Sequence, residues 1–439
     1  MEYFLCLTRR NLCRGLYSLA VILFTFLCVQ PTPTTAQELR ILTSMPAAMF
    51  EPFAEAFEAR NPDITVNVLN KNTNAGVEEI VRGNPRGFDI FWVSSAEAFA
   101  VLNAHDAFRT DENYTSDWRP TPRGNASFYP FALSSIGWAQ LHTSSTPHPS
   151  EWDDLLRPEY VGKVAMTRPS RSGTTHMFVE RFLQVRGWEG GWSYLLALSG
   201  NLSTLTSRSF GVIDGIEKQR FDVGITIDFL ALARADDGLA FSYGKPVMVM
   251  PAQIGILSGG QSPDLAKAFV ELVLSPEGQK ILIRPDVRRI PIDAKLRADA
   301  GPAAQDIESA LQLNWLPYDA LLARDRYWAV NTLFDVFVTF QLKERQQAWR
   351  RLRKLQQSRD DDILSRLPEV EQLLSYMPVT ETDAISQGVN DVPTRVTAFS
   401  APTATQQDML ARWQADATAT MKDVNVLLNG LEQMANQQE

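Results

Sequence analysis

From residue 38 onward, short apolar runs alternate with amphipathic segments, and this alternation constrains the fold more than any other feature. Phe50, Phe53 and Phe57 recur with helical spacing, and AGVEEIVRG (75–83) is a second helical pattern. Three apolar runs flank these helices and have the length of buried strands: ELRILTS (38–44), ITVNVLN (64–70) and FDIFWVSS (88–95). This strand–helix order predicts a mostly parallel sheet with helices on both faces, an α/β architecture.

Serines end two of these expected strands. Ser44 completes the first strand, and Ser94 and Ser95 complete the third. Ligands of parallel α/β sheets bind beyond the carboxyl ends of the strands, so these serines are candidate ligand contacts. Each could instead cap the helix that follows it, and the sequence leaves both alternatives open.

The stretch TRPSRSGTTHMFVERF (167–182) combines arginines and hydroxyl side chains at the start of a helical pattern. Phe178, Phe182 and Val185 mark one face of that helix, which places the preceding turn at its first residues. Backbone N–H groups and the positive end of the helix dipole favour anions at such a position. One hydroxyl would suffice as a cap, whereas arginine adds a bidentate partner for an oxyanion. We therefore predict an anion site formed by Arg171, Ser172, Gly173, Thr174 and Thr175.

Net charge and motif spacing narrow the function classes. The formal net charge of −9 argues against nucleic acid or an anionic membrane as the main partner. The four histidines lack metal-ligand spacing such as HExxH, and no serine stands in a GxSxG motif. The sequence therefore favours a protein that is not an enzyme and needs no cofactor or metal.

Residues 1–36 have the composition of an export signal. Arginines precede an apolar run of ordinary signal-peptide length (16–29), and small residues before Gln37 suit cleavage. An uncleaved anchor is the alternative, and TRRNLCR (8–14) also resembles a twin-arginine signal. All three cysteines lie in this leader, so the exported chain would contain neither disulfides nor thiolate chemistry. We expect a periplasmic protein.

Beyond Pro302 the α/β alternation stops and helical patterns continue. One helix presents a basic face (350–354), which we interpret as solvated. The last helix carries an apolar seam at alternating steps of three and four residues, which suits packing against an upstream helix of the same chain. The seam consists of Leu410, Trp413, Ala417, Met421, Val424, Leu428 and Leu431. We expect this region to be dispensable for ligand binding and to serve a partner.

The leader, FEARNPDITV (57–66), PSRSGTTH (169–176) and LSPEGQKIL (274–282), in this order, resemble the periplasmic solute-binding proteins of ABC-type uptake systems. The chain is most similar to the two-lobed group that binds ferric iron, phosphonate or phosphoglycerate, and within it to binding proteins associated with phosphoglycerate transport regulation. The resemblance implies the type II two-lobed fold, here with an all-helical C-terminal extension. It divides the chain into a signal peptide (1–36), lobe 1 (37–134 and 252–310), lobe 2 (135–251) and the extension (311–439).

The resemblance also implies which loops face the ligand. They match Ser44 and Ser94–Ser95 in lobe 1, and in lobe 2 the turn 171–175, Arg208 with Ser209, and Asp228. Ferric relatives carry adjacent tyrosines where this sequence has Asp228 and Phe229, which argues against a ferric ligand. Asp228 could equally cap the following helix. His176 is expected on the helix surface, and Tyr243 in packing.

We therefore expect an extracytoplasmic protein that captures a small solute bearing phosphate, phosphonate or carboxylate between its lobes. It would deliver this solute to an inner-membrane ABC-type permease. The alternative is a sensing component that reports occupancy to a membrane sensor protein through its C-terminal helices.

Overall fold

A computed structural model describes residues 37–110, 128–313, 318–386, 388–390 and 402–437. The expected signal peptide lies outside the described residues. Within the part of the chain that is described, no helix is both long and apolar enough to cross a membrane.

The first lobe is built on a six-stranded sheet in the order β11-β4-β10-β3-β1-β2. Its strands are β1 (Gln37–Thr43), β2 (Ile64–Asn70), β3 (Ile90–Val93), β4 (Phe128–Ser134), β10 (Met250–Ile256) and β11 (Ile290–Pro291). The first three are parallel, as expected, whereas β10 runs antiparallel to β3 and β4. Its helices are α2 (Ala47–Arg60), α3 (Thr73–Val81), α4 (Ala96–Asn103), α8 (Pro263–Leu274) and α9 (Pro276–Leu282).

The second lobe is built on a five-stranded sheet in the order β7-β6-β8-β5-β9. Its strands are β5 (Ile136–Leu141), β6 (Val164–Thr167), β7 (Leu202–Thr206), β8 (Val223–Ile227) and β9 (Leu239–Tyr243). Its helices are α5 (Gly173–Leu198), α6 (Phe210–Glu217) and α7 (Asp228–Leu232). Gly187 interrupts α5 with φ 74° and ψ 166°, a conformation that only glycine adopts readily, so α5 is two helical segments.

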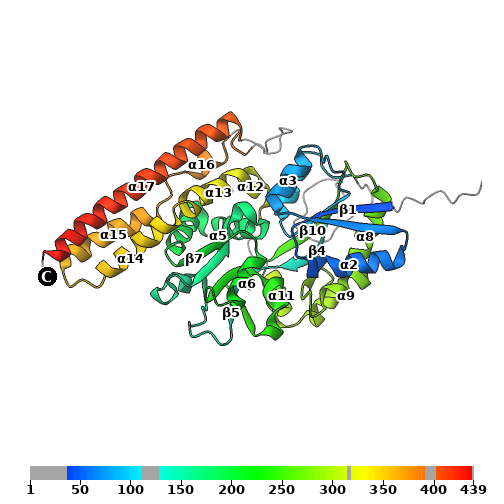
Figure 1. Ribbon diagram of the computed structural model, residues 1–439, viewed down its shortest axis with the longest axis horizontal. Helices are drawn as coiled ribbons and strands as arrows, with labels where there is room; N and C mark the ends of the chain where they lie inside the picture. The colour runs from blue at the N-terminus through cyan, green and yellow to red at the C-terminus, as the bar shows by residue number, and fades with distance from the viewer. Residues whose placement is uncertain (1–36, 111–127, 314–317, 387, 391–401, 438–439) are drawn as a thin grey trace, which may run out of the picture.

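Two chain connections cross between the sheets. β4 ends at Ser134 in the first sheet and β5 begins at Ile136 in the second, so Ser135 alone joins them. The chain returns between β9 and β10, through residues 244–249. Figure 1 shows the two sheets side by side with these connections between them. The short helices α10 (Ala294–Arg297) and α11 (Pro302–Gln312) follow β11. The α/β fold of two lobes is confirmed; the domain boundaries remain our division of the chain.

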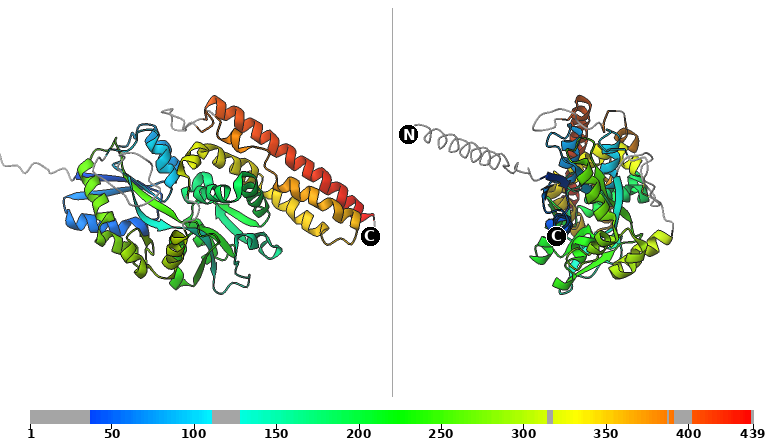
Figure 2. Two further views of the ribbon diagram at one scale, coloured as in Figure 1. Left: turned by 180° about the vertical axis from the view of Figure 1, so that it is seen from behind. Right: turned by 90° about the vertical axis from the view of Figure 1, so that its right-hand side faces the viewer.

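The C-terminal extension is helical, as predicted. It contains α12 (Ala320–Asp325), α13 (Tyr327–Phe334), a π-helical turn η6 (Asp335–Thr339), α14 (Leu342–Leu355), α15 (Asp361–Ser375), α16 (Glu381–Ala384) and α17 (Ala404–Asn436). Figures 1 and 2 show α14, α15 and α17 running together along the second lobe, at the far end of the molecule from β1.

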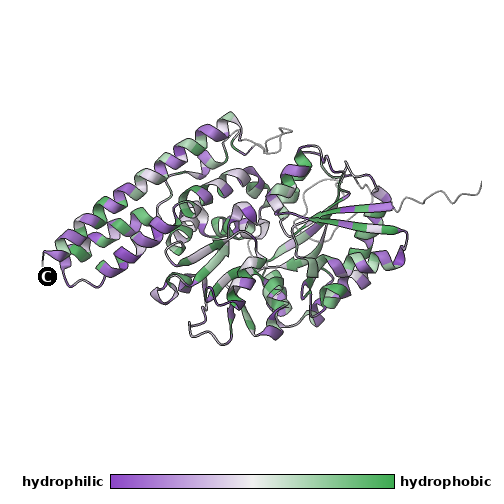
Figure 3. Ribbon diagram, in the orientation of Figure 1, coloured by the Kyte–Doolittle hydropathy of each residue, from purple (hydrophilic) through white to green (hydrophobic). Residues whose placement is uncertain are grey.

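The apolar seam of the last helix packs inside the extension. Six of its residues, Trp413, Ala417, Met421, Val424, Leu428 and Leu431, are buried. Met421, Val424, Leu428 and Leu431 share a core with Leu352 and Leu355 of α14 and Ile363 of α15. Figure 3 shows apolar and polar faces alternating along these helices. The prediction that the seam pairs with upstream helices of the same chain is therefore confirmed.

The basic face of α14 is only partly solvated, which corrects the prediction. Arg351 donates two hydrogen bonds to the carboxylate of Glu432 in α17, both at 2.8 Å. Arg353 donates to Asn201 at 2.5 Å and lies over the ring of Trp349. The basic side chains of α14 thus meet partners in α17 and in the second lobe. The periodicity of a helix shows which residues share a face, but not whether that face meets solvent or another segment.

Buried ionic contacts fix the extension to the second lobe. Arg326, 1% exposed, donates from Nε to both carboxylate oxygens of Glu180 in α5, each at 3.0 Å. Arg168, next to β6, pairs with Asp335 of η6 at 3.0 and 2.7 Å. Since a buried charge is costly unless it is paired, these contacts make the extension part of the folded unit.

Two tyrosines connect the extension to the first lobe. The hydroxyl of Tyr318 donates to Glu97 of α4 at 3.1 Å, and the hydroxyl of Tyr327 donates to Asn74 of α3. Helix α12 also packs against α4. The extension therefore contacts both lobes and bridges them.

Candidate functional site

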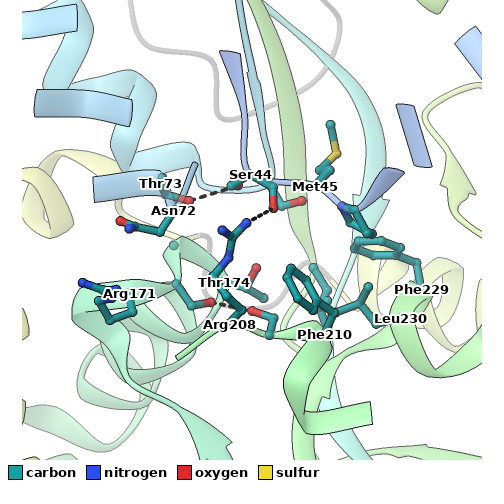
Figure 4. Close-up of a pocket in the computed structure, with 16 residues that line it drawn as sticks. Ser44, Met45, Asn72, Thr73, Arg171, Thr174, Arg208, Phe210, Phe229 and Leu230 are labelled. Carbon is teal, nitrogen blue, oxygen red and sulfur yellow. Dashed lines mark hydrogen bonds between the residues drawn. The ribbon is translucent and has the colours of Figure 1, made fainter. Parts of the chain in front are cut away.

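A small polar cavity lies between the two lobes, at the carboxyl ends of strands in both sheets (Figure 4). The first lobe lines it with residues that follow β1, β2 and β3, and the second with the first turns of α5, α6 and α7. The first lobe contributes Ser44, Met45, Pro46, Asn72, Thr73 and Ser94; the second contributes Arg171, Ser172, Gly173, Thr174, Arg208, Ser209, Phe210, Ile227, Phe229 and Leu230. Eight of the eleven residues predicted from the sequence are among them.

The hydroxyl groups of the cavity are held by one another and by helix starts. Thr73 Oγ1 donates to Ser44 Oγ at 3.1 Å within the first lobe. In the second lobe, Ser172 Oγ lies 2.6 Å from Ser209 Oγ and accepts from the backbone N–H of Thr175 at 3.2 Å. Ser172 is therefore the N-cap of α5, and its hydroxyl also joins the start of α5 to that of α6.

Gly173 sits at a close approach between the two lobes. A Cβ atom at this position would lie 2.7 Å from the Cβ of Ser95 and 2.7 Å from Thr73 Oγ1, both in the first lobe. No side chain fits at such distances without moving the lobes apart. The glycine is therefore required by the approach of the two lobes.

Arg208 reaches across the cavity from the second lobe to the first. Its Nη2 donates to Asn70 Oδ1 and lies 3.4 Å from the carbonyl oxygen of Ser44, and its guanidinium lies over the ring of Phe210. Burial, together with the positive charge of Arg171, lowers the pKa of Arg208. Two cations therefore share one cavity, and none of the described residues that line it is acidic. An anion placed between them would relieve their mutual repulsion.

In this arrangement the cavity measures about 30 Å³. Such a space admits water but no solute of several non-hydrogen atoms. Arg208 and a hydrogen bond from the Asn74 side chain (Nδ2) to the carbonyl of Ser170, 2.9 Å long, hold the lobes together at and beside it. A solute can therefore enter only when the lobes separate or Arg208 turns away.

Three of the predicted residues do not line the cavity. Ser95 is fully buried and donates to Glu97 at 2.5 Å, and Thr175 faces inward behind the cap made by Ser172. Asp228 accepts from the backbone N–H groups of Ser135 and Phe229, both at 2.7 Å. Burial raises the pKa of Asp228 to about 6, although these hydrogen bonds oppose the shift. Its contact with Ser135 places it at the crossing between the lobes, as a structural anchor of that connection.

His176 was expected on a helix surface, and this is wrong. Its side chain is fully buried and its Nδ1 lies 3.1 Å from Asn331 Oδ1 of the extension. Burial lowers the pKa of His176 to about 3, so the ring is neutral. The extension covers a face of α5 that would otherwise be exposed. Tyr243 packs as expected, and its hydroxyl donates to Asp228 at 2.9 Å.

Several lining residues were not anticipated from the sequence. Asn72 and Thr73 follow β2, a strand end that carries no feature distinguishing it from an ordinary polar loop. Their place next to β1 was the available signal, because three parallel strands end on the same edge. The apolar wall of the cavity was also missed: Met45, Phe210, Phe229 and Leu230.

Behind this wall lies Arg289, which is 1% exposed. Its Nη2 donates to Ser94 Oγ at 2.8 Å, and its Nη1 lies 3.5 Å from Met45 Sδ. Its guanidinium lies 4.3 Å from the ring centre of Phe229. All three neighbours line the cavity. The signal in the sequence was a pair of arginines (288–289) directly before a buried apolar strand.

Comparison with known proteins identifies the family. Residues 39–284, more than half of the chain, match the model of the bacterial extracellular solute-binding proteins. The chain belongs to this family. This solute-binding protein is similar to the phosphoglycerate transport regulatory protein PgtC of Salmonella typhimurium, with 32% identity over 345 residues. The match covers 76% of this chain and 85% of PgtC. The resemblance predicted from the sequence is confirmed, and family membership places the protein outside the cytoplasm.

Solved structures of similar solute-binding proteins share the two-lobed fold. The periplasmic binding protein P5PA has a TM-score of 0.56 at 19% identity, covering 65% of this chain and 93% of its own. AfuA of Actinobacillus pleuropneumoniae, solved with fructose-6-phosphate bound, has a TM-score of 0.54 at 17% identity, covering 63% and 97%. About a third of this chain lies outside either match.

The iron-bound protein HitA of Pseudomonas aeruginosa also shares the fold, with a TM-score of 0.51 at 17% identity, covering 63% of this chain and 99% of its own. The cavity described above offers different chemistry from a hard-metal site. Its described lining contains no tyrosine, histidine or carboxylate. Across the described residues, no group of three or more His, Cys, Asp and Glu side chains is placed to hold a metal ion.

Proposed function

We propose that this solute-binding protein captures a small phosphorylated anion between its lobes and delivers it to an ABC-type permease. The supporting observation is the composition of the cavity. Two arginines, six hydroxyl side chains and the first turns of α5 and α6 converge there, and no acidic residue joins them. In a chain with a formal net charge of −9, such a local excess of positive charge suits an anionic ligand.

Phosphate fits these groups better than carboxylate does. A phosphate group offers at least three acceptor oxygens, and the donors surround the cavity from both lobes. Ser44, Thr73 and Ser94 face it from one side, with Arg171, Arg208 and the start of α5 on the other. The similarity to PgtC makes phosphoglycerate the first solute to test. The protein binds and releases its solute without chemical change, so we class it as a non-enzyme.

The direct experiment is calorimetric titration of the exported chain with 3-phosphoglycerate and with inorganic phosphate. Charge-assisted hydrogen bonds contribute roughly 1.5–3 kcal/mol each. Arg171→Ala should therefore weaken binding about tenfold or more. Arg220→Ala, an exposed arginine of the second lobe outside the cavity, is the matched control and should bind normally. Equal affinity in the wild type and Arg171→Ala would remove Arg171 from the site.

A second function, occupancy sensing, is favoured by the contacts of the extension. It is fixed to the second lobe by buried ion pairs, such as Arg326–Glu180, and reaches the first lobe through Tyr318 and Tyr327. If the lobes separate, these tyrosine contacts must break or the extension must move. Lobe closure on a solute would thus change the position of helices that a membrane sensor protein could recognise.

Hydrogen exchange of the full chain tests this second function. Saturating 3-phosphoglycerate should slow amide exchange in α12 and α13 as well as around the cavity, because closure docks both helices on the first lobe. Protection confined to the cavity would show that the extension does not respond to the solute, and would leave transport as the function.

A further inference from the structure

Arg289 is a buried cation without an ion-pair partner. Among the described residues, none places a carboxylate oxygen within salt-bridge distance of it. Asp228 interacts with it electrostatically, but the oxygens of Asp228 are engaged with Ser135, Phe229 and Tyr243. Burial lowers the pKa of Arg289 to about 10, so the side chain is charged at neutral pH. A buried charge without a directly bonded carboxylate is costly to the folded state, which suggests that Arg289 serves the function of the protein.

The surroundings of Arg289 connect it to the cavity. The guanidinium lies between two aromatic rings, 5.2 Å from the ring centre of Phe131 and 4.3 Å from that of Phe229. Cation–π contacts of this kind offset part of the lost hydration. Its one strong hydrogen bond, from Nη2 to Ser94 Oγ, is directed to a residue that lines the cavity.

This hydrogen bond fixes the role of the Ser94 hydroxyl. Arginine only donates, whereas a serine hydroxyl has one proton to donate and two lone pairs. Because Arg289 occupies a lone pair of Ser94 Oγ, the Ser94 proton remains free to be donated elsewhere. Ser44 Oγ likewise accepts, from Thr73, so its proton is free by the same argument.

We propose that Arg289 is a positioning residue of the solute site, which sets the Ser94 hydroxyl as a hydrogen-bond donor to the bound anion. This inference rests on the proposed function, because it requires an anion in the cavity. Arg289 then acts from behind the wall, through Ser94, without touching the solute. It also brings positive charge to the first lobe, whose lining residues carry none.

The test is a double-mutant cycle in the full exported chain, with 3-phosphoglycerate and inorganic phosphate as calorimetric probes. Arg289→Met keeps most of the side-chain volume and removes the charge, and Ser94→Ala removes the hydroxyl. Each single variant should bind about tenfold more weakly. The double variant should also lose only about tenfold, since the two residues act as one unit. A hundredfold loss, the product of the single effects, would overturn the proposal.

The melting temperature of Arg289→Met distinguishes a positioning role of Arg289 from a role in packing. Replacing an unpaired buried charge by an apolar side chain is often neutral or stabilising, so the melting temperature of Arg289→Met should be equal or higher. A large drop in melting temperature together with weaker binding would make Arg289 a structural residue and overturn the proposal. Arg288→Met is the matched control, because Arg288 pairs with Asp236 at 2.8 Å on the surface and should leave affinity unchanged.

Two outcomes test the positioning role of Arg289 even if the Arg289→Met variant does not fold. Ser94→Ala with wild-type affinity would overturn this role, because Arg289 would have nothing through which to act. Failure of the wild-type chain to bind either probe would overturn the proposed function and this role with it. If the wild type binds and the losses of binding free energy in Arg289→Met and Ser94→Ala are additive, the positioning role of Arg289 is wrong and the proposed function stands.

Discussion

Tyr327 of the extension donates its hydroxyl proton to the side-chain oxygen of Asn74 in the first lobe. The amide nitrogen of the same Asn74 donates to the carbonyl of Ser170 in the second lobe at 2.9 Å. Asn74 is adjacent to Thr73, which lines the cavity. One side chain therefore joins both lobes and the extension beside the candidate site.

Tyr327→Phe should weaken solute binding about two- to tenfold. The substitution keeps the ring and removes one hydrogen bond, worth roughly 0.5–1.5 kcal/mol, that exists only when the extension is docked on the first lobe. Calorimetry with 3-phosphoglycerate measures the effect. Tyr376→Phe, on an extension tyrosine that is 55% exposed, is the control and should bind as the wild type does. Unchanged affinity in Tyr327→Phe would show that this contact does not take part in closure.

Gly173→Ala should prevent full closure of the lobes. The added methyl group would meet Ser95 and Thr73 at 2.7 Å, while the backbone at this position does not demand glycine. We expect at least a tenfold loss of affinity with little change in melting temperature. Gly211→Ala is the matched control, because its new methyl group would lie 3.6 Å from Thr206, an ordinary contact. Normal binding by Gly173→Ala would mean that the solute-bound lobes stand further apart than they do here.

Glu97 should make stability depend on pH. Burial raises the pKa of Glu97 to about 8 from an ordinary value of 4.5, although its hydrogen bonds with Ser95 and Tyr318 oppose the shift. The folded state therefore holds a proton that the unfolded state releases. The resulting stabilisation is complete below about pH 4.5 and is lost as the pH rises through 8.

Glu97→Gln should remove this dependence, because the amide mimics the protonated acid. Denaturant unfolding at pH 9 should find the variant more stable than the wild type, by on the order of 3 kcal/mol, with a much smaller difference at pH 5. Glu55→Gln, at an exposed position of α2, is the control and should show the same dependence of stability on pH as the wild type. Parallel curves for Glu97→Gln and the wild type would show that Glu97 is charged in the folded protein.

Arg326→Met should destabilise the protein by roughly 3–5 kcal/mol, because it leaves Glu180 charged and unpaired in the interior. The double variant Arg326→Met, Glu180→Leu should recover most of this loss in a thermal unfolding experiment. We expected the extension to be dispensable for binding, and this stays a prediction; its removal would also take Arg326 away from Glu180. Similar losses in the single and double variants would contradict the importance of this pair.

The sequence predicted what depends on local pattern. Strand ends followed by serine, and an arginine turn before an apolar helical period, placed six lining residues because strand and helix starts are encoded within a few residues. The other two, Arg208 and Ser209, came from the family resemblance. It could not place what depends on distant segments. His176 is buried by Asn331, 155 positions away, and Arg289 reaches Ser94 across 195 positions. No local period reports such contacts.

Asp228 is a predicted ligand contact for which distant neighbours decide a different, structural role. Its position at the end of β8 suits a ligand contact and a structural anchor equally, and its neighbours decide between them. Three donors, on Ser135, Phe229 and Tyr243, occupy its carboxylate and turn it toward the crossing strands. Two of these donors, Ser135 and Tyr243, come from other segments of the chain, which the sequence around Asp228 does not reveal.

The central claim is that the cavity between the lobes binds a phosphorylated anion through its two arginines. Calorimetric titration of the wild type and of the double variant Arg171→Ala, Arg208→Ala with 3-phosphoglycerate tests it most directly. We predict saturable binding of one solute per chain by the wild type and a loss of at least a hundredfold in the double variant, from two charge-assisted contacts of roughly 1.5–3 kcal/mol each. Equal affinity of the two proteins, with both folded, would contradict the account.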